Sequence, residues 1–190
     1  MTALTIVGFG FVLALFSLPG VVVHEFAHKK ACDWIGVPVV DVVYFRFENP
    51  PGYVRHVEPD RYRASFVISV APFLVNTVVA LAAFAGLAWL VHSIETGSLE
   101  AASRKGVVAA AVLCWVGTSV GVHAFPSTGD ANTLWTRARA EWLRSPVVIL
   151  GLPFVVLIYV ANLLSRLYLD TLYAIGLLLL AWYAVGEVAI

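Results

Sequence analysis

Apolar runs of membrane-spanning length are the feature that most constrains this sequence. A bilayer core roughly 30 Å thick takes about 20 apolar residues of helix. Hydrophobic residues make up 61% of the chain and charged residues 13%, and the mean hydropathy of +0.88 excludes an ordinary soluble domain. We therefore predict an all-α polytopic membrane protein with about five transmembrane helices in the lipid bilayer. The five runs are residues 3–23, 65–91, 106–125, 147–164 and 171–186.

Two local features modify this plan. Pro19 and Gly20 lie inside the first run, and a proline there is expected to kink the helix because it removes a backbone donor. Residues 36–63, between the first two runs, contain the β-branched and aromatic stretch VVDVVYFRF and the turn sequence NPPG. This segment predicts a small β-hairpin at the membrane surface.

Positive charge indicates how the chain is oriented. Lys and Arg concentrate in cytoplasmic connections of membrane proteins. Nine of the twelve fall on one side of the predicted spans, which places the N-terminus outside and both larger polar loops in the cytoplasm. These nine are Lys29, Lys30, Arg46, Arg55, Arg61, Arg63, Arg137, Arg139 and Arg144; the other three are Arg104, Lys105 and Arg166. The formal net charge is zero and no dense basic run occurs, so no nucleic-acid partner is expected.

The pentapeptide HEFAH, residues 24–28, interrupts the first apolar segment with three ionisable groups. On a helix, His24 and His28 share one face about 40° apart around the axis. In zinc hydrolases the HExxH motif supplies two imidazole ligands, and its glutamate acts as the base toward a zinc-bound water whose pKa is about 7. The motif predicts a Zn²⁺ site with Glu25 as the catalytic base. The alternative is a hydrated cluster at the membrane interface beside Lys29 and Lys30.

A third zinc ligand must come from another part of the chain, because catalytic zinc normally takes three protein ligands. Two further crossings return the chain to the same side at HAFPSTGDANTLW, residues 123–135. We expect Asp130 to be the ligand, with a helix N-cap as its alternative role. His123 is the competing ligand, or otherwise a residue that supports the ligands from behind.

Four stretches in order resemble the site-2 protease family of intramembrane zinc metalloproteases. They are HEFAH at 24–28, PPGYV at 50–54, APFLVN at 71–76 and, more loosely, FPSTGDA at 125–131. In that family a short β-rich segment follows the HExxH helix, the second helix carries an asparagine motif, and the third helix supplies an aspartate. Here Gly129-Asp130-Ala131 stands where the family has Leu-Asp-Gly.

The resemblance implies a zinc metalloendopeptidase that cleaves membrane protein or peptide substrates in or near transmembrane segments, at an active site near the cytoplasmic face. Residues 1–145 would form the metalloprotease-like core of three transmembrane helices with its interfacial β loop. Residues 146–190 would add a transmembrane helical pair within a single structural domain. The chain resembles a minimal member without a PDZ or regulatory domain, so regulation would come from a partner or an oligomer. Asn76 would bind substrate or stabilise developing charge, or else form an interhelical hydrogen bond.

Two other functions remain open. The first is a non-peptidase membrane protein with a structural or sensory zinc site that acts through partner binding. The second is a small metal transporter, which would need polar residues aligned through the midplane of several spans; apart from Asn76 the sequence offers few.

Overall fold

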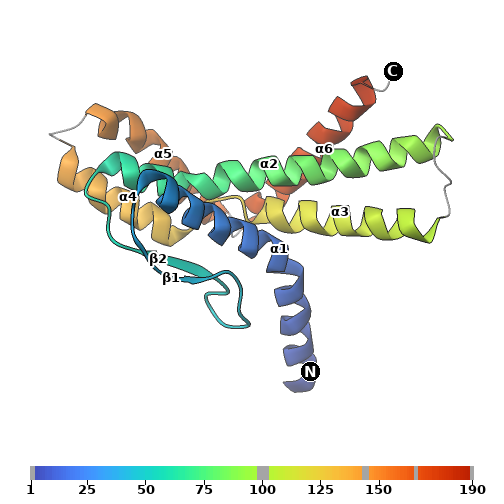
Figure 1. Cartoon of the computed structure of the whole chain (residues 1–190), viewed down its shortest axis with the longest axis horizontal. Helices are drawn as coiled ribbons and strands as arrows, with labels where there is room; N and C mark the ends of the chain where they lie inside the picture. Colours follow the sequence, from blue (N-terminus) through green and yellow to red (C-terminus); the bar gives the residue numbers. More distant parts are fainter. Residues whose placement is uncertain (1–2, 98–102, 143–145, 165–166, 189–190) are drawn as a thin grey trace.

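A computed structural model describes residues 3–97, 103–142, 146–164 and 167–188, which are mostly helical (Figure 1). Within these residues, four helical segments are long and apolar enough to cross a membrane: Gly8–Ile35, Tyr62–Glu95, Arg104–Val122 and Leu169–Glu187. Arg144 and Arg166 of the charge count lie outside the described residues. The elements in order are α1 (Ala3–Ile35), β1 (Val39–Val43), β2 (Tyr53–His56), α2 (Tyr62–Glu95), α3 (Arg104–Val122), α4 (Thr128–Glu141), α5 (Pro146–Leu164) and α6 (Leu169–Val188).

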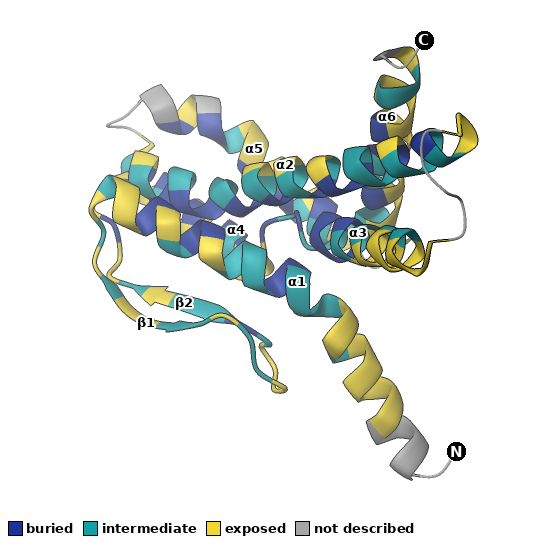
Figure 2. Ribbon diagram, turned by 45° about the vertical axis from the view of Figure 1, so that its right-hand side comes forward, coloured by how far each residue is buried: buried dark blue, intermediate teal, exposed yellow. Residues whose placement is uncertain are grey.

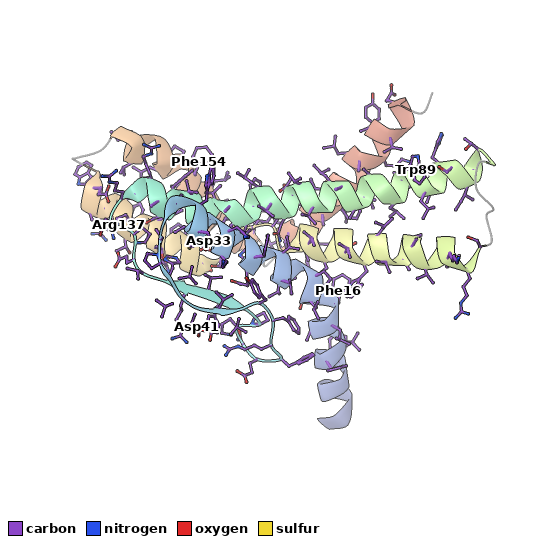
Figure 3. All side chains as sticks on the ribbon, in the orientation of Figure 1. Phe16, Asp33, Asp41, Trp89, Arg137 and Phe154 are labelled. Carbon is purple, nitrogen blue, oxygen red and sulfur yellow. The ribbon has the colours of Figure 1, made fainter. Side chains whose placement is uncertain are left out.

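The first helix is continuous but bends near Phe16, just before Pro19, which confirms the predicted kink (Figures 1 and 3). After the bend, α1 packs on α2 and α3. The Gly20 amide donates to Ser119 Oγ over 3.0 Å, and a Cβ on Gly20 would overlap the Ser119 carbonyl, so glycine is needed for this approach. Before the bend, α1 diverges from the other helices, and most side chains between Phe9 and Leu15 are exposed (Figure 2).

The predicted β-hairpin is confirmed between α1 and α2. Strands β1 and β2 pair antiparallel, with Val43 opposite Tyr53 and an irregularity between Val39 and Asp41. The connecting loop folds back on itself, since the Arg46 amide donates to the Pro51 carbonyl over 2.7 Å. The hairpin lies alongside α1 and α4 (Figure 2).

Small residues let α2, α3 and α6 pack closely, as is usual between membrane helices. An ideal Cβ on Gly117 of α3 would lie 2.6 Å from the ring of Phe84 on α2, so the ring occupies the space that a side chain would fill. The buried side chains of this cluster are Ala80, Phe84, Val120, Leu177 and Ala181.

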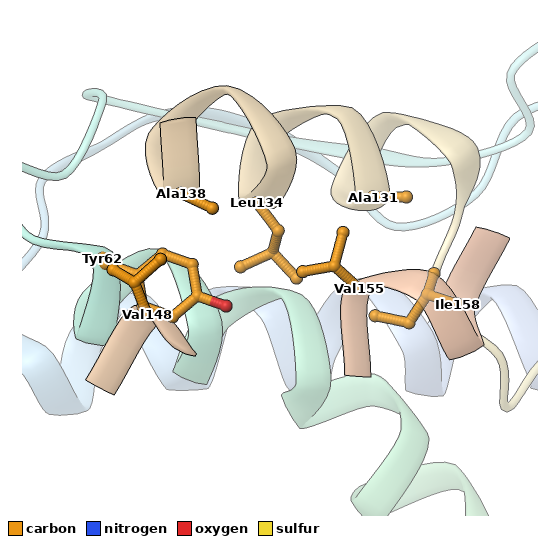
Figure 4. Close-up of a cluster of buried hydrophobic side chains, with 7 residues drawn as sticks. All are labelled: Tyr62, Ala131, Leu134, Ala138, Val148, Val155 and Ile158. Atoms are coloured by element: carbon orange, nitrogen blue, oxygen red, sulfur yellow. The ribbon is translucent and has the colours of Figure 1, made fainter. Parts of the chain in front are cut away.

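A second cluster joins α4 and α5 to the start of α2 (Figure 4). Aliphatic side chains of α4 face those of α5 across this cluster, and the Tyr62 ring closes it at one end. These contacts extend along most of α4 and hold the helix in place, so that its first turn faces α1. The members are Tyr62, Ala131, Leu134, Ala138, Val148, Val155 and Ile158.

The last two helices, α5 and α6, cover the two predicted runs 147–164 and 171–186. Phe154 of α5 contacts Phe66 with ring centroids 5.7 Å apart, and Tyr173 of α6 bonds Thr77 over 2.7 Å. The rest of α6 continues toward the cluster around Phe84. Both helices therefore run in the direction of α2, and they do not turn back on each other (Figure 1). α5 has 19 residues, which is about 28 Å of helix. That length is close to the roughly 30 Å of a bilayer core, so the length of α5 does not decide whether it crosses the membrane.

The two ends of the long α2–α3 pair differ in what surrounds them. The hairpin and α4, with Arg137, lie at one end, and Trp89 lies toward the other (Figure 3). Large apolar side chains are exposed along the sides; they include Phe9, Val12, Leu74, Val78, Val107, Val112, Leu172, Leu179 and Leu180. Exposed apolar surface of this extent is typical of helices that face lipid.

Candidate metal centre

A cavity of about 600 Å³ opens where α1, the hairpin, the segment after α3 and the start of α6 meet. It brings together residues that are far apart in the sequence, including the HEFAH motif and Asp130. Its lining consists of Val21, His24, Glu25, His28, Pro50, Pro51, Gly52, Tyr53, Val54, His56, Val122, His123, Phe125, Pro126, Ser127, Gly129, Asp130, Thr133, Asn162 and Asp170.

His24 and His28 occupy successive turns of α1, with ring centroids 4.9 Å apart. Each ring is held by a backbone carbonyl: His24 Nδ1 bonds His123 O over 2.8 Å, and His28 Nδ1 bonds Ile68 O over 3.0 Å. A carbonyl oxygen only accepts, so both Nδ1 atoms carry the proton and both Nε2 atoms are left as lone-pair donors. Metal-ligating histidines are oriented in this way.

Asp130 is the third residue of α4 and serves two functions with its two oxygens. Oδ2 accepts hydrogen bonds from the Ser127 amide (2.8 Å) and hydroxyl (2.6 Å), and the Ser127 hydroxyl accepts from the Asp130 amide, which forms a capping box. Oδ1 lies 3.6 Å from His28 Nε2. The two roles predicted as alternatives, ligand and cap, are therefore compatible in one carboxylate.

The charge state of Asp130 suits a metal ligand. Burial raises the pKa of its carboxyl, but the neighbouring His28 and the Ser127 hydrogen bonds more than offset this effect. The pKa consequently lies below its ordinary value, and the group is an ionised carboxylate at neutral pH.

One ligand atom from each of His24, His28 and Asp130 can be chosen so that all three lie within 4.8 Å of one another. Zinc bonds of about 2.1 Å in tetrahedral geometry separate ligand atoms by roughly 3.4 Å. The 3.6 Å between His28 and Asp130 is close to that separation. The donor set thus suits a zinc ion, and ligand atoms that lie further apart, within the 4.8 Å limit, would have to approach one another to bind it.

Glu25 lies on the same wall of the cavity, one residue after His24. The end of the hairpin loop, directly before β2, packs on it: an ideal Cβ on Gly52 would lie 2.8 Å from Glu25 Cγ and 2.8 Å from Val21 Cγ1. Only glycine allows the loop backbone this close to the carboxylate-bearing side chain.

His123 lies behind the histidine pair. Its carbonyl accepts the bond from His24, and its own Nδ1 donates to Ser119 O over 2.8 Å. Burial lowers the pKa of the His123 ring, so the ring is neutral. Its ring is not part of the cluster of candidate ligand atoms. Of its two predicted roles, the structure favours support of the ligands.

Asn76 is fully buried and does not line the cavity. Its Nδ2 atom lies 2.9 Å from His123 O, 3.3 Å from Val120 O and 3.4 Å from Gly20 O, so it joins α2 to α1 and to the end of α3. A substrate contact would require Asn76 to reach the cavity wall. Of the two roles left open, the structure favours the interhelical hydrogen bond over a contact with substrate or developing charge.

Sequence reasoning did not predict that Asn162 and Asp170 line the cavity. Asn162 comes from α5 and bonds the segment that leads into α4, and Asp170 lies at the start of α6, where its Oδ1 accepts from the Thr171 amide over 2.8 Å. A polar side chain within the apolar run 147–164 was the available signal for Asn162.

Comparison of the chain with family models, with curated proteins and with solved structures gave no match.

Proposed function

We propose that this protein is an integral membrane zinc metalloprotease that hydrolyses peptide bonds in or near transmembrane segments of its substrates. One observation carries the proposal: the two HEFAH histidines and Asp130, from separate helices, converge in an open cavity that Glu25 also lines. The order of its motifs, which resembles that of the site-2 proteases, supports the same function.

The donor set supports zinc over other common metals. Two imidazoles and one carboxylate are typical ligands of catalytic zinc, whereas magnesium and calcium prefer oxygen donors alone. Three ligands leave one coordination position open, as in catalytic zinc sites, whereas structural sites are usually closed by four protein ligands. When bound, zinc would polarise the scissile carbonyl and make a water molecule acidic enough to attack at neutral pH.

The chain's own residues account for the remaining steps. Glu25 accepts the proton of the attacking water and then donates it to the leaving amine. The carbonyls of His123 and Ile68 hold the histidine rings in the tautomer that offers Nε2. Asp130 supplies the negative charge that balances part of the ion's charge.

The position of the hairpin supports the proposal that the substrate is a peptide. Tyr53, Val54 and His56 of β2 line the cavity, and β2 pairs with β1 along one edge. An extended substrate segment would bond to the other edge, as in other complexes in which a peptide adds a strand to a sheet. In the orientation expected from the Lys and Arg distribution, with the N-terminus outside, this site lies near the cytoplasmic face.

The decisive experiment replaces Glu25 by glutamine in the full-length protein, purified in detergent. We expect E25Q to retain zinc and the wild-type unfolding temperature but to lose cleavage of transmembrane peptides by at least about a hundredfold. Glu58→Gln serves as the control, because that glutamate is exposed, pairs with Arg137 on the protein surface and does not line the cavity. Full cleavage by E25Q would contradict the proposal. A wild-type protein that binds zinc and cleaves none of the tested transmembrane peptides would favour a structural or sensory zinc site.

A further inference from the structure

An asparagine on α5 connects the last part of the chain to the candidate metal centre. Asn162 Nδ2 donates to the Pro126 carbonyl over 2.9 Å, and its Oδ1 accepts from the Thr128 hydroxyl over 3.3 Å. The same Nδ2 also bonds the Ile158 carbonyl one turn earlier, which fixes the side chain on its own helix. Asn162 thus bonds the backbone of the residue before Ser127 and the side chain of the residue after it.

Ser127 is the residue that orients Asp130. Its amide and hydroxyl both bond Oδ2, which leaves Oδ1 toward His28. A continuous series of hydrogen bonds therefore runs from α5 through residues 126–128 to one oxygen of the candidate ligand. A rotation of the Ser127 backbone would move that oxygen, and Asn162 is placed to prevent it.

We propose that Asn162 is a positioning residue for the metal centre: through Pro126, Ser127 and Thr128 it aims Asp130 Oδ1 at the two histidines. This inference depends on the metal site of the proposed function. It assigns to α5, which lies outside the predicted protease-like core, a part in forming that site. Residues that hydrogen-bond to ligands typically change metal affinity by about 10–100-fold when removed, and a partner one step further away should reach the lower end of that range.

A second contact between the same helices provides a matched control. Tyr159, one turn before Asn162 on α5, donates its hydroxyl to Asn132 Oδ1 of α4 over 2.7 Å. Tyr159→Phe removes a hydrogen bond between α4 and α5 without touching residues 126–128. Asn162→Leu has similar volume and removes both contacts to that segment. Thr128→Val removes only the hydroxyl contact, from an exposed position where folding is not at risk.

The experiment measures zinc affinity by competition with a chelator, and the visible spectrum of the cobalt-substituted protein, for the full-length wild type and these three variants. We expect Asn162→Leu to weaken zinc binding about tenfold and to change the cobalt spectrum. Thr128→Val should show a smaller change in the same direction, and Tyr159→Phe should match the wild type.

Each other result overturns the inference in a recognisable way. Wild-type affinity in Asn162→Leu, or in Thr128→Val if the leucine variant does not fold, shows that the ligand is positioned without α5. Equal weakening in Tyr159→Phe shows that general packing of α4 on α5 is responsible. A wild-type protein without zinc affinity refutes the metal site itself, and with it the proposed function, before any variant is compared.

Discussion

The Oδ1 atom of Asp130 lies 3.6 Å from Nε2 of His28, while the other oxygen of the same carboxylate is held by the Ser127 cap. The Asp130 side chain thereby caps the N-terminus of α4 and also faces the HEFAH helix. The first turn of α4 should consequently control both the stability of that helix and the affinity of the site for zinc.

Replacing Ser127 by alanine tests this dual role. Loss of an N-cap costs about 1 kcal/mol of stability, and release of Oδ2 should weaken zinc binding about tenfold. Ser103→Ala is the matched control, because Ser103 caps α3 by accepting from the Gly106 amide over 3.0 Å, far from the cavity. Unfolding temperature and chelator competition should show lower stability in both variants and weaker zinc binding only in Ser127→Ala. Equal zinc affinity in the two variants would refute the link between cap and ligand.

Gly52→Ala should separate catalysis from metal binding. The new methyl carbon would lie 2.8 Å from side-chain carbons of Glu25 and Val21. Carbon atoms do not normally approach this closely, so the hairpin loop must shift. We expect peptide cleavage to fall about tenfold or more, since small misplacements near reacting groups are costly, with zinc content unchanged. Gly10→Ala, which meets open space, is the control. Unaltered cleavage by Gly52→Ala would show that the loop is not required near Glu25.

The course of α5 and α6 predicts how many times the chain crosses the membrane. Both helices run in the direction of α2, so together they should make one interrupted crossing, which gives four in total and places both termini on the same side. Reporter fusions that are active only on one side of the membrane, attached to either terminus, measure this directly. Termini on opposite sides would restore the five-span arrangement.

Close packing of α2 on α3 should make Gly117 sensitive to any added atom. A methyl group there would lie 2.6 Å from the buried Phe84 ring, and overpacking of this kind costs about 1–3 kcal/mol. Gly176→Ala on α6 has no neighbour within 4 Å and should leave stability unchanged or raise it. Denaturant unfolding of the two variants in detergent gives the comparison; equal stabilities would contradict the observed packing.

Short-range patterns carried most of what could be predicted. The HEFAH spacing, the apolar runs, the kink at Pro19 and the hairpin between 36 and 63 depend on residues that are near one another in sequence. Asp130 was within reach because two crossings return the chain to the starting side, a constraint that the bilayer imposes.

Contacts between residues far apart in the sequence could not be predicted in the same way. The direction of α5 depends on side-chain packing against α2, which the apolar composition of the run does not reveal. For Asn76 the sequence left two roles open, contact with substrate or developing charge and an interhelical hydrogen bond. Its three carbonyl partners belong to α1 and the end of α3, which no local pattern reveals.

The most direct test of the metal centre is the zinc content of the purified full-length protein and of its His24→Ala, Asp130→Ala and His123→Ala variants. We expect one zinc ion per chain in the wild type, loss of zinc in the His24 and Asp130 variants, and retention in the His123 variant, whose carbonyl still supports His24. Full zinc affinity in Asp130→Ala together with loss in His123→Ala would contradict the ligand set on which the proposed function depends.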